Sequence, residues 1–170
     1  MKKGLMCFVS IVCVIAMLVS MGSVSFAQET EYKSTQHFLD YMDELGIPYN
    51  YYGIDDDNWE AVSVIFGPSI SSSFECFIYF EQNNHEVEFR IWDLVKPSAG
   101  ENFTLSTINE LNANWKYAKF VLNERDSTVQ AEMDMYIDGD HCARSVYDAM
   151  DSLLDIIEDE YTSQALRKLE

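Results

Sequence analysis

The sequence predicts an α+β fold, in which an antiparallel sheet is covered by helices in the order helix, three strands, helix, two strands, helix. Three observations predict it. Two pairs of segments alternate apolar and polar residues and are joined by short polar turns, as in β-hairpins with one buried face. Apolar residues recur at helical spacing before, between and after these pairs. Apart from a short loop at 67–73, no run rich in Pro, Gly or Ser occurs after residue 28, which indicates a single domain.

The hairpin that organises the fold is formed by strands expected at 115–122 and 128–137. Its register follows from two apolar pairs and one pair of opposite charge: Leu122 with Val129, Phe120 with Ala131, and Lys119 with Glu132. A shift by one residue would destroy all three pairs at once, because it would turn every side chain to the other face.

A second hairpin is expected at 74–81 and 86–92, with a tight turn at Asn83-Asn84, since asparagine tolerates positive φ angles. One register aligns three apolar pairs on the same face: Phe80 with Val87, Ile78 with Phe89, and Cys76 with Ile91. Residues 61–66 have the composition of a further strand, and an edge strand can begin at 49–52.

The helices before and after the sheet have clear ends in the sequence. The first is expected to begin with Ser34 or Thr35 as its N-cap and to end at Gly46, which adopts the left-handed conformation easily. The last is expected to begin after an N-cap at Asp140. Its apolar stripe has one residue per turn: Cys142, Val146, Met150, Leu153 and Ile157.

Residues 1–27 have the features of a signal peptide: two lysines, an apolar run, and small residues at Ser25 and Ala27 before the expected cleavage site. A retained membrane anchor is the alternative, because residues 5–27 could just span a bilayer. With cleavage, the protein is expected to be secreted or extracytoplasmic and not inserted in a membrane. The chain then divides into four parts: the signal peptide at 1–27, a flexible lead-in at 28–33, a single α+β domain at 34–163 and a frayed tail at 164–170.

The chain is strongly acidic, with 29 Asp and Glu against 11 Lys and Arg, and has a formal net charge of −18. The signal peptide contains two lysines and no acids, so its removal changes this charge to −20. Such a charge argues against nucleic acid and anionic membranes as partners. It favours solubility or a basic partner.

No catalytic constellation occurs in the sequence. His37, His85 and His141 are each expected to be exposed and apart from other ligands, except that His141 precedes Cys142. Adjacent residues of a helix diverge by about 100°, so these two cannot bind one metal ion. The aspartates at 55–57 lack the ligand spacing of an EF-hand and are expected to form a solvated turn. Neither an enzyme nor a metal or other cofactor is therefore expected.

Two pairs of polar or reactive residues have a structural interpretation and an alternative. Cys76 and Cys142 are expected to be buried free thiols, with a disulfide as the alternative because export would permit one. Asn109 and Asn112 lie one turn apart near the end of the second helix. We expect them to cap this helix and to hydrogen-bond the entry to the next strand, with partner recognition as the alternative.

The outward face of the sheet has more aromatic residues than solubility requires. The candidate protein-binding residues are Phe77, Tyr79, Trp92, Tyr117 and Tyr136. Aromatic residues are enriched at interfaces, so a protein partner or a homodimer is expected, unless the rings only cover neighbouring charges. The second hypothesis is a small-ligand-binding or enzymatic protein with a pocket under the sheet, in which the aromatics of 49–59 form a lid.

The order of elements and the residues around the second helix resemble the YbjN family, proposed sensory transduction regulators of bacteria. The resemblance covers residues 35–161 and is carried by Ile108-Asn109-Glu110-Leu111-Asn112, Trp115, Lys119-Phe120 and Glu132-Met133-Asp134. It implies a fold like that of type III secretion chaperones, with a strongly bent antiparallel sheet that often dimerises. It also implies a non-enzymatic regulatory role in binding other proteins.

The signal peptide should be absent from the exported protein. N-terminal sequencing of the purified protein is expected to begin at Gln28 or within a residue or two of it. An intact Met1 on protein recovered from the membrane would instead identify residues 5–27 as an anchor.

Overall fold

The computed structural model of the 170-residue chain describes residues 30–67, 73–83, 85–138 and 141–170. The signal peptide and its cleavage site lie outside these residues. So do Asn84 and Asp140, for which a turn and an N-cap are predicted.

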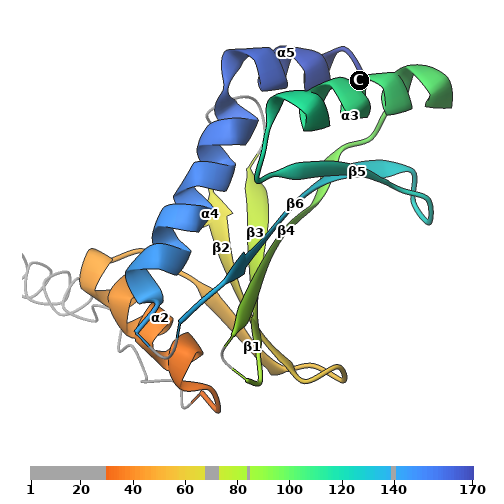
Figure 1. Ribbon diagram of the computed structural model, residues 1–170. Helices are drawn as coiled ribbons and strands as arrows, with labels where there is room; N and C mark the ends of the chain where they lie inside the picture. Colours follow the sequence, from red (N-terminus) through yellow and green to blue (C-terminus); the bar gives the residue numbers. More distant parts are fainter. Residues whose placement is uncertain (1–29, 68–72, 84, 139–140) are drawn as a thin grey trace, which may run out of the picture.

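Within this part of the chain, six strands form one antiparallel sheet in the order β1-β2-β3-β4-β6-β5 (Figure 1). The elements follow one another as α2 (Lys33–Leu45), β1 (Asn50–Ile54), β2 (Trp59–Phe66), β3 (Phe74–Glu81), β4 (Glu86–Val95), α3 (Glu101–Asn114), β5 (Lys119–Asn123), β6 (Thr128–Tyr136), α4 (Ala143–Glu158) and α5 (Glu160–Arg167). The α+β class is therefore confirmed. The predicted order counted three strands before the second helix and gave β1 only as an edge strand that can begin at 49–52. It did not divide the last helix into α4 and α5.

Both predicted hairpin registers are confirmed. In the β5–β6 pair, Lys119 lies opposite Glu132 and Phe120 opposite Ala131. In the β3–β4 pair, the inward side chains form the predicted apolar pairs and all are fully buried: Cys76, Ile78, Phe80, Val87, Phe89 and Ile91. The strand expected from residue 115 begins only at Lys119, because Trp115 still ends helix α3.

Strand β4 is longer than predicted and contains an irregularity. Its register with β6 shifts between Ile91 and Val95, and Asp93 has a φ of 51°. Extra residues in one strand of a pair bend that strand and increase its twist. Figure 1 shows the sheet strongly twisted, with β5 turned toward α3.

The helices pack against one face and one end of the sheet. Helix α4 packs against α2, where the rings of Tyr41 and Tyr147 meet edge to face at 5.8 Å. Helix α3 packs against β5 and α5 (Figure 1). The opposite face of the central strands is not covered by any helix that the structure describes (Figure 1).

The start of helix α2 corrects two predictions. The helix begins at Lys33, so Ser34 and Thr35 lie inside it and are buried rather than acting as N-caps. Its entry is held instead by the Glu60 carboxylate of β2, which accepts the backbone N–H groups of Glu31 at 2.9 Å and Tyr32 at 3.1 Å. Residues 31–32 are therefore fixed, whereas the sequence predicts a flexible lead-in over 28–33. No local sequence pattern indicates that Glu60, nearly thirty residues away, binds these backbone groups.

The predicted frayed tail is also wrong. Helix α5 is capped by Asp159, whose carboxylate accepts the N–H groups of Tyr161 and Thr162. The indole N–H of Trp115 donates to the hydroxyl of Thr162 at 2.8 Å. Beyond the helix, Leu169 is fully buried and its carbonyl accepts the backbone N–H of Ser98 at 2.7 Å. These contacts with distant segments hold a tail that looks polar and terminal in the sequence.

One of the two asparagines near the end of α3 has one part of the predicted role, the hydrogen bonding of the next strand. The side chain of Asn112 donates to the carbonyl of Phe120 at 2.9 Å and accepts the backbone N–H of Phe120 at 2.7 Å. It therefore fixes β5 to the end of α3. Asn109 is exposed on the same helix.

Replacing Asn112 with alanine should leave both backbone groups of Phe120 without their partner. Because an unsatisfied, partly buried polar group costs about 1–3 kcal/mol, the free energy of unfolding of Asn112→Ala is expected to fall by that amount. Urea denaturation measures it, with Asn109→Ala as the matched control, for which a change within about 0.5 kcal/mol is expected. Equal losses in the two variants would contradict the bridging role.

Candidate protein-binding surface

The uncovered side of the sheet, here named the open face, is formed by alternate residues of the strands. Cross-strand pairing brings Ser63, Phe77, Arg90, Glu132 and Lys119 into one row across it. Successive side chains of a strand point to opposite faces, so these residues point away from the buried apolar pairs of β3 and β4.

Aromatic side chains lie along the open face from β1 to β4. The rings of Tyr52 and Phe77 lie 5.7 Å apart, and those of Phe77 and Tyr79 stack at 6.2 Å. Trp92 of β4 lies on the same face and offsets part of the rise that burial causes in the pKa of Tyr79. We name Tyr52, Phe77, Tyr79 and Trp92 the aromatic row. Ring separations of this size are typical of stabilising aromatic contacts.

The structure places three of the five predicted binding residues together and separates the other two. Phe77, Tyr79 and Trp92 belong to the aromatic row. Tyr136 lies at the end of β6 and is 82% exposed. Tyr117 precedes β5, is 69% exposed and lies under the ammonium group of Lys116, which is 5.1 Å from the ring centre. Neither makes a ring contact with the aromatic row among the described side chains.

Sequence reasoning missed two residues of this surface. Tyr52 is 56% exposed in edge strand β1, whose pairing with β2 shifts at Gly53 and so obscures the alternation. Ile65 is 57% exposed in β2, opposite Glu75. Strand β2 is apolar on both faces, so alternation could not assign Ile65. The available signal for Tyr52 was its position two residues after Asn50, because residues two apart in a strand point to the same face.

Part of the aromatic row covers a smaller residue, Ser63, whereas the alternative interpretation was that the rings cover neighbouring charges. Ser63 is fully buried on the open face. Its hydroxyl donates to Glu75 at 2.5 Å and lies 3.3 Å from the hydroxyl of Tyr52. Tyr79 is half-buried, and burial is the main cause that raises its pKa. Trp92 nevertheless remains 39% exposed, so the row offers apolar surface to solvent.

The charges around the aromatic row are mostly negative. Arg90 lies between two carboxylates, at 2.6 Å from Glu88 and 2.6 Å from Asp134. Lys119 is the other cation of this face in the described strands, and it lies opposite Glu132. The acidic residues are Glu75, Glu81, Glu86, Glu88, Glu132 and Asp134. The described part of the face therefore carries an excess of negative charge.

Glu88 is partly removed from water in this surface. Burial raises the pKa of its carboxyl, and this effect exceeds the opposing attraction of Arg90. A charged group that is only partly solvated is costly to bury further unless a cation replaces the lost water.

The described cysteines and histidines do not gather into a metal site. Cys76 lies on the opposite face of β3, where burial raises the pKa of its thiol to about 12. Cys142 is also buried, and no disulfide joins the two cysteines, as predicted. The rings of His37 and His141 stack at 4.9 Å, a contact that the sequence did not predict, and His37 is half-buried rather than exposed. No group of three or more potential metal ligands gathers among the residues described.

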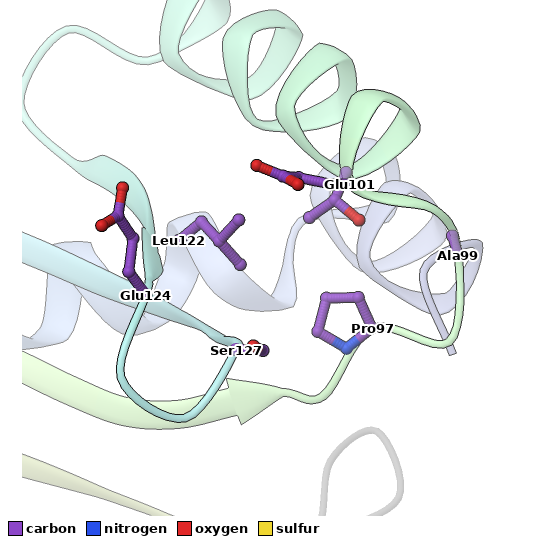
Figure 2. A pocket seen from close by; sticks show the side chains of 7 residues that line it. Pro97, Ala99, Glu101, Leu122, Glu124 and Ser127 are labelled. Atoms are coloured by element: carbon purple, nitrogen blue, oxygen red, sulfur yellow. The ribbon is translucent and has the colours of Figure 1, made fainter.

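The alternative hypothesis predicts a pocket under the sheet. The structure has a cavity, but in a different place. A cavity of about 560 Å³ lies between the end of β4, the start of α3 and the β5–β6 turn (Figure 2). None of the aromatics of 49–59 lines it. The described residues also include no helix that is long and apolar enough to cross a membrane.

This architecture is similar to that of two solved structures, whereas the sequence comparisons find no match. No protein-family model and no curated protein sequence matches the chain. A chain in the crystal structure of the ExsC–ExsE complex superposes with a TM-score of 0.51 and 12% identity, over 79% of this chain and 96% of that one. The crystal structure of YbjN from E. coli superposes with a TM-score of 0.50 and 14% identity, over 77% and 90%.

The chain has the fold of YbjN and of the type III secretion chaperone ExsC. The resemblance inferred from the sequence is therefore confirmed at the level of the fold. Identities of 12% and 14% transfer neither a partner nor a site, because one fold serves many functions.

The raised pKa of Glu88 predicts how stability depends on pH. At pH 7 the charged side chain is penalised in the folded state, so Glu88→Gln should have a free energy of unfolding at least as high as the wild type. This advantage should fade as the pH falls through the folded pKa toward the unfolded value of about 4.3, where the wild-type side chain is protonated too.

Urea denaturation between about pH 3 and about pH 8 checks this, with Glu86→Gln as a control that removes one negative charge from the same face of β4. A Glu88→Gln variant that is clearly less stable at pH 7 would show that the ion pair with Arg90 outweighs the cost of burial.

Proposed function

We propose that this protein is an exported, non-enzymatic module of the YbjN kind, which acts in regulation by binding another protein. The aromatic row on the open face is the observation that carries the proposal. Soluble proteins seldom leave several contiguous aromatic side chains on an uncovered sheet face unless the face binds something. Trp92 and Tyr79 are of the residue types that most often dominate binding energy.

Two further observations support a protein as the ligand. The structurally similar ExsC is a chaperone that occurs in complex with a second protein, ExsE, so this architecture is able to hold a partner chain. The aromatic row is also a face of a sheet rather than an enclosed cavity, and such faces fit protein surfaces better than small molecules. The signal-peptide features of residues 1–27 support an encounter outside the cytoplasm.

The charge of the open face indicates what kind of protein binds there. The partner should contribute lysine or arginine side chains to the acidic surroundings and apolar side chains to the aromatic row. Self-association through this face is less favourable, because it would bring two acidic surfaces of two acidic chains together. A homodimer is therefore the second candidate and a separate protein the first.

Affinity capture with the exported protein tests the proposal. The double variant Trp92→Ala with Tyr79→Ala should lose the captured partner, because truncating one anchor typically costs about 2 kcal/mol, or about 30-fold in Kd. Tyr117→Ala with Tyr136→Ala is the matched control, since both residues are exposed tyrosines outside the row. Its captured partner should be unchanged, and added salt should weaken binding in the wild type.

Analytical sedimentation at micromolar concentration separates the two candidates. A monomer is expected for the wild type and for both double variants. A wild-type dimer that the variant Trp92→Ala with Tyr79→Ala disperses would identify the homodimer instead. A partner that the wild type and this variant capture equally would remove the open face from consideration.

A further inference from the structure

A second candidate site lies at the edge of the sheet, away from the aromatic row. Figure 2 shows the cavity of about 560 Å³ beside β5, with Leu122 between Glu124 on one side and Glu101 and Pro97 on the other. Its lining comes from three segments, namely the β4–α3 connection, the first turn of α3 and the β5–β6 hairpin: Pro97, Ala99, Glu101, Thr104, Leu122, Glu124 and Ser127. Cavities of this size hold ligands of several hundred daltons or a short peptide segment.

The cavity opens onto an unpaired stretch of strand edge. Strand β5 is the last strand of the sheet and pairs only with β6 among the described strands. Asn112 binds both the N–H and the C=O of Phe120, so these two groups point away from β6. In an antiparallel strand, every second residue points its N–H and C=O to the same side. The backbone groups of Leu122 therefore point outward as well, and Leu122 lines the cavity.

Asn112 limits how much of this edge is available. At Phe120 its side-chain amide occupies the position that a neighbouring strand would take. Beyond Asn123 the chain enters the hairpin turn. Only one residue of β5, Leu122, thus presents an N–H and a C=O to an incoming chain, next to a cavity that can receive side chains. An extended segment of a few residues fits this arrangement, whereas a long added strand does not.

Two carboxylates indicate the charge of that segment. Glu101 and Glu124 line the cavity, and neither belongs to an ion pair of the described residues. Pro97, Ala99 and Leu122 supply apolar contact between and beside them. A lysine or arginine side chain matches both features, because its aliphatic stem can lie on apolar surface while its cationic end meets the carboxylates.

We propose that this edge cavity binds a short extended peptide segment with a basic side chain, which pairs with the backbone of Leu122 and places its cation between Glu101 and Glu124. The segment adds two backbone hydrogen bonds to β5 and no further strand to the sheet. This site uses a different surface from the aromatic row, and it does not depend on the function proposed for that row.

The test is an NMR titration of the exported protein with a blocked pentapeptide, acetyl-Thr-Val-Arg-Val-Thr-amide. The backbone amide of Leu122 should shift on saturation, as expected for a new hydrogen bond. The variants Glu101→Gln and Glu124→Gln should each weaken binding about tenfold or more, as should a peptide with Glu in place of Arg. Both carboxylates are exposed, so these variants should fold normally. Glu110→Gln, on the same helix but outside the cavity, is the matched control and should bind normally.

Two further probes separate strand pairing from simple attraction of a cation. A peptide that is N-methylated at the pairing position lacks the N–H donor and should bind at least about tenfold more weakly. Acetyl-arginine methylamide binding as tightly as the pentapeptide would overturn the pairing. So would saturation without a shift at Leu122, or the absence of binding at millimolar peptide.

The open face provides the last control. The double variant Trp92→Ala with Tyr79→Ala should bind the pentapeptide as the wild type does. Loss of peptide binding in this variant would mean that the peptide uses the aromatic row and would overturn the edge site. Conversely, a failure of the edge site leaves the partner capture by the open face untouched, because that experiment uses other residues and another readout.

Discussion

The complete burial of one face of strands β3 and β4 is the constraint on which the rest of the structure depends. Six apolar side chains of these strands have no contact with solvent, and they form cross-strand pairs beneath the helices: Cys76, Ile78, Phe80, Val87, Phe89 and Ile91. Burying such side chains contributes about 1.5–3 kcal/mol each. Because the side chains of a strand alternate, this burial forces Phe77, Tyr79 and Arg90 to the other face.

Polar side chains that bridge distant segments then place the helices around this core. The carboxylate of Glu60 is fully buried and is satisfied by two backbone N–H groups and by the hydroxyl of Tyr51. Burial is the largest cause that raises the pKa of the Tyr51 phenol, and the hydrogen bond to Glu60 is the second. The phenol therefore keeps its proton and donates it to the hydrogen bond. Asn112 fixes α3 to β5, and Thr162 fixes α5 to Trp115. Each bridge joins an element to a partner that sequence distance alone would not suggest.

The two candidate sites use different parts of one acidic molecule. The open face combines aromatic side chains with Glu88 and Asp134, which both pair with Arg90. The edge cavity combines an unpaired backbone position with Glu101 and Glu124. In both proposed sites, apolar contact is expected to give affinity, and negative charge is expected to select basic ligands and to repel a second copy of the chain. The bridge by Asn112 protects most of the β5 edge from unintended strand pairing.

The sequence by itself determined the α+β class, both hairpin registers, the inward residues and the end of the first helix, because alternation and turn residues are local. It also found three members of the aromatic row, since they lie on regular strands. Only the tertiary structure decided that Tyr52 joins them, that Tyr117 and Tyr136 do not, and that residues 164–170 form ordered structure. Those outcomes depend on the shift in β1, the bend in β4 and contacts between distant segments, which no local pattern specifies.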